Sequence, residues 1–192
     1  MKVYIASPLF NEAEKRENER IDEVLIKAGY ETFLPQRDGF LYSELVEQIK
    51  KSDCKNEEAE IIAINLISHL DIYQVCKGCK ATVLNLNGRV PDEGGVSEGA
   101  LCFRSEIPLV IYKEDSRTLI GGKDNPLVVG LTRFIIANEI GDIPNKLEIA
   151  INQKESDYSI IMGVAEKLFG DYNPKSRNLD NIIQLGMKHF IQ

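Results

Sequence analysis

A glycine-rich stretch between two short apolar segments constrains the fold of this chain most strongly. Residues 81–86 (ATVLNL) and 107–112 (IPLVIY) are typical of buried parallel strands, and residues 92–102 (DEGGVSEGALC) open a helix between them. Strand, loop, helix and strand in this order predict a βαβ unit. In open α/β sheets ligands bind beyond the carboxyl ends of the strands, so we expect a ligand site where Asp92 and Glu98 lie.

The rest of the chain continues this alternation. We expect a first strand at 2–6, a helix between an Asn11 cap and a stop at Gly29, and a second strand at 30–35 with a polar loop at 36–39. Residues 41–67 are helix-rich, and Asp71 is expected to begin a further short helix that ends at Gly78. Later segments are a polar loop at 113–126, an apolar segment at 127–140 that is helical or partly extended, and helices at 147–151, 158–169 and 179–190.

Length and composition favour one globular α/β domain. At 192 residues the chain supports one well-buried core, so we predict a single domain over 1–192, with a core at about 1–140 and a C-terminal helical extension at about 145–192. The net charge is −7 without a basic stripe, which argues against a nucleic acid polymer as partner. No apolar run is long enough for a membrane span and no signal peptide is recognised, so the expected location is cytoplasmic.

The four cysteines leave metal and redox alternatives open. Cys76 and Cys79 form a CxxC pair, but a structural zinc site usually takes two such pairs, and His69 and His189 stand at no ligand spacing. A thioredoxin-type motif precedes a helix, whereas this pair precedes a strand. Reduced structural thiols are therefore the preferred interpretation, and no metal site is predicted.

Glu98 and Asp92 are the candidate catalytic pair. Unpaired N–H groups at a helix N-terminus are expected to keep a nearby carboxylate ionised, which makes Glu98 a candidate nucleophile. Asp92 lies six residues earlier, and two carboxylates near one pocket are the minimum for chemistry at an anomeric carbon. The alternative is that Glu98 only complements the helix dipole.

Several segments together resemble the nucleoside 2-deoxyribosyltransferase family. The resemblance covers roughly residues 2–135. Its parts are YIASPLF at 4–10, LPQ at 34–36, D-x-G-x-x-x-E from Asp92 through Gly94 to Glu98, and DSR at 115–117 followed by Asn125 and VGL at 129–131. It implies a flavodoxin-like or Rossmann-like three-layer sandwich with a mostly parallel sheet, to which the C-terminal helices are an addition. It also implies transfer of 2-deoxyribose between purine or pyrimidine bases in nucleotide salvage, without a cofactor, by at least a dimer.

The same resemblance implies roles for individual residues. Glu98 is expected to attack the anomeric carbon and form a 2-deoxyribosyl-enzyme intermediate, while Tyr4 holds the carboxylate by a hydrogen bond. Asp71 and Asp92 match positions that serve base protonation and contacts to base or sugar. Structural alternatives stay open, because Tyr4 also suits a packed strand aromatic and Asp71 a helix cap.

Two further positions come from the resemblance with structural alternatives of their own. Gln36 matches a position that contacts the base, and Asn125 one that reaches the sugar hydroxyl of a neighbouring subunit's site. Gln36 also suits a solvated turn, and Asn125 a turn before proline.

Some residues depart from the family pattern. Gly95 stands where threonine is common, and the stretch from Glu98 through Gly99 lacks the usual glycine two positions after the glutamate. Lys80 replaces an aspartate, and the spacing from Asp71 to the third strand is one residue longer than expected. Gly94, Gly95 and Ser97 could form an anion nest, so a hydrolase of 2-deoxynucleoside 5′-monophosphates is an alternative. A non-catalytic nucleotide-binding module is another.

Overall fold

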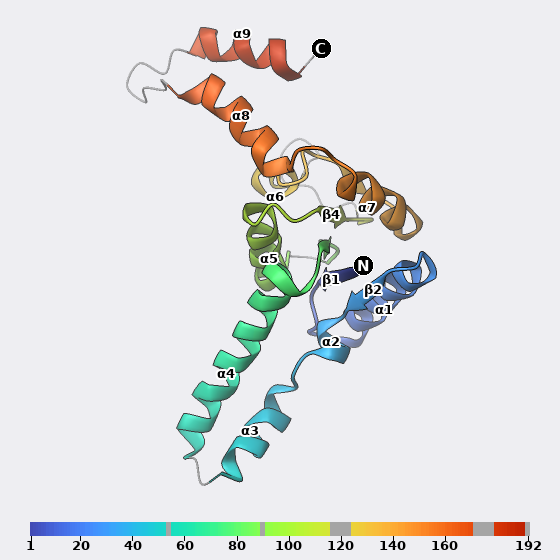
Figure 1. Cartoon of the computed structure of the whole chain (residues 1–192), viewed down its shortest axis with the longest axis vertical. Helices are drawn as coiled ribbons and strands as arrows, with labels where there is room; N and C mark the ends of the chain where they lie inside the picture. The colour runs from blue at the N-terminus through green and yellow to red at the C-terminus, as the bar shows by residue number, and fades with distance from the viewer. Residues whose placement is uncertain (53–54, 89–90, 116–123, 171–178, 191–192) are drawn as a thin grey trace.

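Parallel strands form one sheet at the centre of the molecule (Figure 1). The computed structural model describes residues 1–52, 55–88, 91–115, 124–170 and 179–190, and within these the sheet has five strands in the order β2-β1-β3-β4-β5. The strands are β1 (Lys2–Ala6), β2 (Glu31–Phe33), β3 (Ala81–Asn85), β4 (Leu109–Tyr112) and β5 (Ile136–Ala137). The order reverses between β1 and β3, which is the switch point where ligands of such sheets bind.

The helices connect the strands and extend beyond them. In chain order they are α1 (Glu12–Lys27), α2 (Pro35–Asp38), α3 (Tyr42–Lys50), α4 (Asn56–Tyr73), the π-helical turn η1 (Gln74–Gly78), α5 (Glu93–Arg104), α6 (Pro126–Gly130), the 3₁₀ turn η2 (Ile140–Asp142), α7 (Ile143–Ile151), α8 (Asp157–Phe169) and α9 (Leu179–Phe190).

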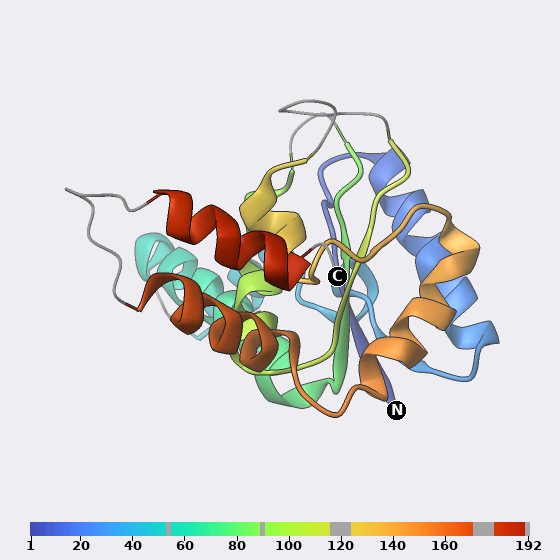
Figure 2. The same ribbon diagram turned by 90° about the horizontal axis from the view of Figure 1, so that it is seen from above.

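Alternation along β1 sorts the core into two layers. Val3 and Ile5 are fully buried among side chains of α1 and α7 on one face of the sheet. Tyr4 and Ala6 are fully buried on the other face, among side chains of η1, α5 and α6. Figure 2 shows the sheet between these helices. The predicted α/β three-layer sandwich with a mostly parallel sheet is therefore confirmed.

Local signals explain the first helix. The Asn11 side chain accepts hydrogen bonds from the backbone N–H groups of Ala13 and Glu14, at 2.9 and 3.0 Å, so it caps α1 as predicted. Gly29 follows the helix with a φ of +88°, in the left-handed region that ends helices and favours glycine.

Two sequence expectations were wrong. Residues 36–39 were expected as a polar loop, but Pro35 begins the short helix α2, whose Asp38 carboxylate accepts a hydrogen bond from the Leu34 N–H at 2.8 Å. Asp71 was expected to begin a new helix, but it lies inside the last turn of α4. No glycine or proline stands in residues 67–71, so α4 continues through them and Asp71 is not an N-cap.

Two helical parts stand off the sheet. Helices α3 and α4 form an antiparallel arm that projects from one end of the molecule, and α8 and α9 lie at the other end (Figure 1). By contrast, α7 covers the sheet through the buried Ile143 and Leu147. No helix in the described ranges is both long and apolar enough to cross a membrane. The predicted loop residues 116–123 and linker residues 171–178 lie outside the described residues.

Candidate active site

Tyr4 and Glu98 form the centre of the candidate site. The Tyr4 side chain points from the middle of β1 toward α5, and its phenol donates a hydrogen bond of 2.6 Å to Glu98 Oε1. The Tyr4 ring stacks on Phe33 of the neighbouring strand, with ring centroids 5.5 Å apart and an interplanar angle of 10°. This stacking fixes the ring, so the hydroxyl holds one carboxylate oxygen in place.

The first turns of α5 bring Glu98 to this position. The Asp92 carboxylate caps the helix by accepting a hydrogen bond from the Gly95 N–H at 2.6 Å. Gly94 and Gly95 lie inside the helix, and Glu98 follows in the second turn. Asp92 therefore both begins the helix and lies near enough to Glu98 for its charge to raise the Glu98 pKa.

A glycine allows α5 to approach the sheet closely. A methyl group at Gly99 would lie 2.9 Å from Leu84 Cδ2 of β3, closer than side chains normally come. Because Gly99 follows Glu98 directly, this close contact sets how near the glutamate lies to β1. The departure from the family pattern at Gly99 thus has a packing explanation.

Burial controls the charge of Glu98. Burial, together with the negative charges of Asp71 and Asp92, raises the pKa of the carboxyl from its usual 4.5 to about 7, against the lowering effect of the Tyr4 hydrogen bond. The sequence argument from the helix N-terminus expected an ionised carboxylate. The pKa of about 7 is higher than that argument implied, because desolvation of Glu98 in the second turn outweighs the effect of the helix dipole.

Asp71 is the third carboxyl group of the site. Burial raises the pKa of Asp71, and its negative charge in turn raises the pKa of both Tyr4 and Glu98. Asp71 therefore approaches the pair from α4, while Asp92 approaches from the start of α5. Glu98 thus feels the charges of two further carboxyl groups, an arrangement that favours its protonated form.

A π-helical turn follows Asp71 and accommodates an extra residue. The N–H of Cys79 donates to the carbonyl of Gln74 at 2.8 Å, so the helix widens by one residue before β3. An extra residue of this kind fits the longer spacing expected between Asp71 and the third strand. Asp71 still lies near Tyr4, because its charge raises the Tyr4 pKa.

The comparison with protein families agrees with this arrangement. The sequence profile of the family described as "Nucleoside 2-deoxyribosyltransferase" matches residues 3–170. The chain belongs to this family. No functionally curated protein matches the chain in sequence.

Two solved structures share the fold of this family member. A conserved protein from Enterococcus faecalis V583 has a TM-score of 0.58 at 22% identity, covering 78% of this chain and 98% of its own. A 2-deoxyribosyltransferase from the psychrotolerant bacterium Bacillus psychrosaccharolyticus has a TM-score of 0.55 at 16% identity, covering 76% and 91%. At these identities the likeness concerns the fold.

Gln36 and Asn125, which the family resemblance pointed to, lie on other elements. The Gln36 amide donates to the Lys15 carbonyl at 3.1 Å and accepts from Asn18 at 3.3 Å, so its side chain lies against α1. Asn125 is exposed and caps α6, accepting from the Leu127 N–H at 2.9 Å. Neither contacts Glu98 through a hydrogen bond given by the structure, and their binding roles stay predictions.

Gly94 and Ser97 lie on α5 with Glu98. Gly94 is exposed in the first turn, and the exposed Ser97 hydroxyl donates to the Glu93 carbonyl at 2.8 Å in the second turn. The nitrogen of Gly95 is already bonded to Asp92. The backbone N–H of Gly95 is therefore not free to bind an anion in the nest considered for these residues.

Sequence reasoning missed Phe33. The stacking partner of Tyr4 lies directly opposite it in the parallel register of β1 and β2. The aromatic position in a short strand was visible, but its pairing with Tyr4 depends on a register that the sequence does not define.

The cysteines do not form a metal site in the described part of the chain. Cys76, Cys79 and Cys102 are free thiols there, and Cys54 lies outside the described residues. Burial raises the pKa of Cys79 to about 11 and that of Cys102 to about 12, which keeps both thiols protonated and unreactive. No group of three or more His, Cys, Asp or Glu side chains suited to a metal ion occurs among the described residues.

Proposed function

We propose that this protein transfers 2-deoxyribose between purine or pyrimidine bases through a covalent intermediate on Glu98. The observation that carries this proposal is the Tyr4 hydrogen bond to Glu98, 2.6 Å long, in a buried setting that raises the Glu98 pKa to about 7. A carboxyl group with such a pKa is substantially ionised near neutral pH and weakly solvated, which suits a nucleophile.

In the first half-reaction the Glu98 carboxylate attacks the anomeric carbon of a 2-deoxynucleoside. A bond forms between a carboxylate oxygen and this carbon, the N-glycosidic bond breaks, and its electron pair goes to the leaving base. Asp71 supplies a proton to that base, since burial raises its pKa and favours the protonated acid. The Tyr4 phenol stays hydrogen-bonded to the other carboxylate oxygen, Oε1, and so limits rotation of the carboxyl group.

The second half-reaction reverses these steps with another base. The incoming nitrogen attacks the anomeric carbon, the bond to Glu98 breaks, and the proton lost by the base returns to Asp71. Two displacements at one carbon retain its configuration. No cofactor takes part in this scheme, and the family membership supports deoxynucleosides and free bases as the ligands. We place the enzyme in cytoplasmic nucleotide salvage as a homo-oligomer, with Asn125 reaching a neighbouring site.

An exchange assay tests the proposal. The protein is incubated with thymidine and free adenine, and the products are separated by chromatography; formation of deoxyadenosine is the expected result. Release of thymine without a new nucleoside, or release of base from a deoxynucleoside monophosphate, would instead identify an N-glycosidase. Thermal stabilisation by these ligands with no product at all would identify a binding module. Glu93→Ala, an exposed carboxyl on the same helix, is the matched control for Glu98→Ala.

A further inference from the structure

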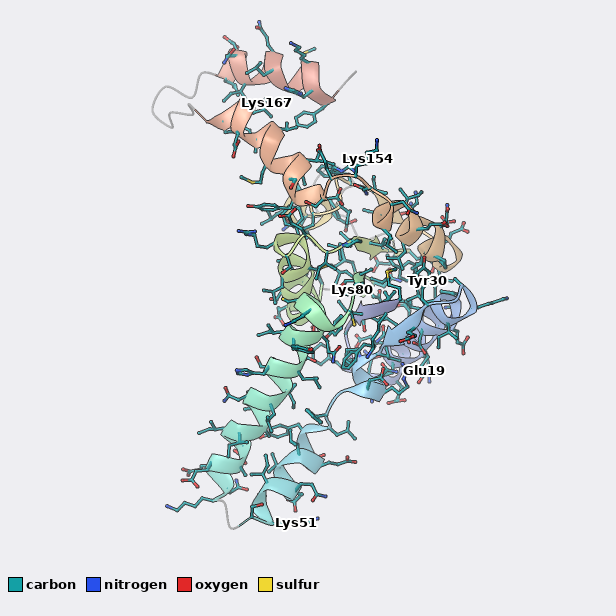
Figure 3. The ribbon with its side chains drawn as sticks, viewed as in Figure 1. Glu19, Tyr30, Lys51, Lys80, Lys154 and Lys167 are labelled. Carbon is teal, nitrogen blue, oxygen red and sulfur yellow. The ribbon has the colours of Figure 1, made fainter. Side chains whose placement is uncertain are left out.

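Strand β2 ends the sheet beside β1, and one of its side chains stacks on Tyr4. It has three residues and pairs with β1 alone among the described strands, in a parallel register that sets Phe33 beside Tyr4. Figure 3 shows Tyr30, directly before β2, and Glu19 of α1 on the same flank of the body. A short edge strand has a hydrogen-bonded neighbour on one side only, so side-chain contacts must fix its position.

A cluster of charged and polar side chains fixes β2 to its neighbours. Its centre is Arg37 of α2, whose guanidinium donates to Asp22 Oδ2 of α1 at 2.7 Å and to Thr32 Oγ1 of β2 at 3.1 Å. The same guanidinium forms a two-pronged pair with the Asp38 carboxylate, at 2.9 and 2.7 Å. The Thr32 hydroxyl donates in turn to the buried Asp22. Because the cluster joins α1, β2 and α2 by charge-assisted hydrogen bonds, β2 is held in one position.

Phe33 extends this fixed position to Tyr4. The Phe33 side chain is buried in the same core layer as Tyr4, and the Lys2 ammonium lies 5.3 Å from the centroid of its ring, a cation–π contact that also holds it. The near-parallel stack of the two rings limits tilting of the Tyr4 ring. The hydroxyl lies at the end of that ring, so a tilt would move it away from Glu98 Oε1, which is 2.6 Å distant.

We propose that Phe33 is a positioning residue of the reaction, which acts through the Tyr4 ring to keep the phenol hydrogen-bonded to the Glu98 carboxylate. This role rests on the proposed function, in which that carboxylate is the nucleophile. The hydrogen bond favours the charged form of Glu98, so a looser bond makes the carboxyl group harder to ionise. Phe33 therefore influences the pH at which the nucleophile becomes active, although its contact is with the Tyr4 ring.

The titratable groups that act on Tyr4 and Glu98 lie on elements other than β2. Besides burial, the negative charges of Asp71 on α4 and of Asp92 at the start of α5 raise the Glu98 pKa. Besides burial and Glu98 itself, Asp71 and the Cys79 thiol after η1 raise the Tyr4 pKa. A substitution on β2 keeps all of these groups, so its effect on Glu98 passes through the Tyr4 ring.

A carbon-13 NMR titration of the Glu98 carboxyl group tests the proposal without substrate. Protein labelled at the side-chain carboxyl carbon of glutamate is titrated between pH 5 and 9, and the Glu98 signal is assigned by its absence from Glu98→Gln. The titration midpoint should lie at about 7 in the wild-type protein. In Phe33→Leu it should move up by about half a pH unit or more, because the hydrogen bond that favours the charged form is weakened. Phe33→Met, whose flexible side chain fills much of the same space without a flat face, should shift it in the same direction.

Leu34→Ala is the matched control. Leu34 follows Phe33 directly and is equally buried, but it belongs to the core layer on the other face of the sheet. Its truncation should lower stability and leave the Glu98 midpoint unchanged. In Tyr4→Phe protein, Phe33→Leu should add no further shift, because the hydroxyl through which Phe33 acts is absent.

Circular dichroism establishes that each variant is folded. An unchanged midpoint in Phe33→Leu and Phe33→Met, or an equal shift in the wild-type and Tyr4→Phe backgrounds, would overturn the proposal. The titration requires no turnover, so a wild-type protein that fails to exchange bases would contradict the proposed function alone, while the midpoints would still decide the role of Phe33.

Discussion

The hydroxyl of Tyr4 lies 2.6 Å from Glu98 Oε1 and donates a hydrogen bond to it across the space between β1 and α5. The two residues stand 94 positions apart in the chain; Tyr4 is fully buried in the core layer that contains η1, α5 and α6, and Glu98 is half-buried on α5. This bond lowers the Glu98 pKa against burial and two neighbouring negative charges. The proposed reaction, in which Glu98 must be ionised, therefore depends on this bond.

Tyr4→Phe should shift the pH dependence of catalysis. The nucleophile must be deprotonated, so kcat/KM should rise with pH through about 7 in the wild-type protein. Removing the phenol removes a bond that favours the charged form, so the rising limb should move to higher pH by about one unit or more. The measurement is kcat/KM of base exchange between pH 5 and 9. If kcat/KM fell by the same factor at every pH and still rose through about pH 7, Tyr4 would only orient the carboxylate.

Glu98→Gln should stabilise the protein at alkaline pH. The folded-state pKa of about 7 lies above the usual 4.5, so the folded protein binds more protons than the unfolded chain between these values, and stability falls as pH rises through this window. Replacing the carboxyl with an amide removes this loss of folding stability at high pH, which amounts to at most about 3 kcal/mol.

Thermal or urea unfolding at pH 5 and pH 8 measures this effect. The stability difference between Glu98→Gln and wild type should be larger at pH 8. Glu93→Gln, an exposed change on α5, should keep the wild-type fall in stability between the two pH values. If Glu98→Gln also lost stability between pH 5 and pH 8 as the wild type does, Glu98 would not be the buried carboxyl group that titrates.

Gly99→Ala should disturb both stability and catalysis. The added methyl group would lie 2.9 Å from Cδ2 of the fully buried Leu84, so this side chain or α5 must shift, at a cost of about 1–3 kcal/mol. A shift of α5 carries Glu98 away from Tyr4, so the rate of exchange should fall. Leu84→Ala in the same chain should restore part of the activity by making room.

Gly163→Ala is the control for this change. Gly163 lies within α8, and among the described residues no atom outside its own stretch of helix stands within 4 Å of the position of an added methyl group. Alanine there should be neutral or stabilising by up to about 1 kcal/mol. Equal effects of the two substitutions on urea unfolding would contradict the packing account of Gly99.

The sequence predicted the parts of the site that depend on local pattern. Strand alternation located Tyr4, and the strand, glycine and helix order located Glu98, since both follow from residue periodicity. The place of Asp71 was predicted wrongly, because an acidic residue inside a continuous helix looks like a cap. The raised pKa of Glu98 was not predicted, since it depends on burial, which is a property of the tertiary structure. The role of Gly99 depends on the distance between α5 and β3, which no local pattern defines.

Mass spectrometry of the quenched enzyme tests the central claim most directly. The protein is mixed with a 2-deoxynucleoside, quenched rapidly with acid, digested and mapped. A 2-deoxyribosyl adduct should appear on the peptide that contains Glu98, and it should be absent from Glu98→Gln and present in the Glu93→Gln control. An adduct on another residue, or base exchange by Glu98→Gln at the wild-type rate, would contradict the account.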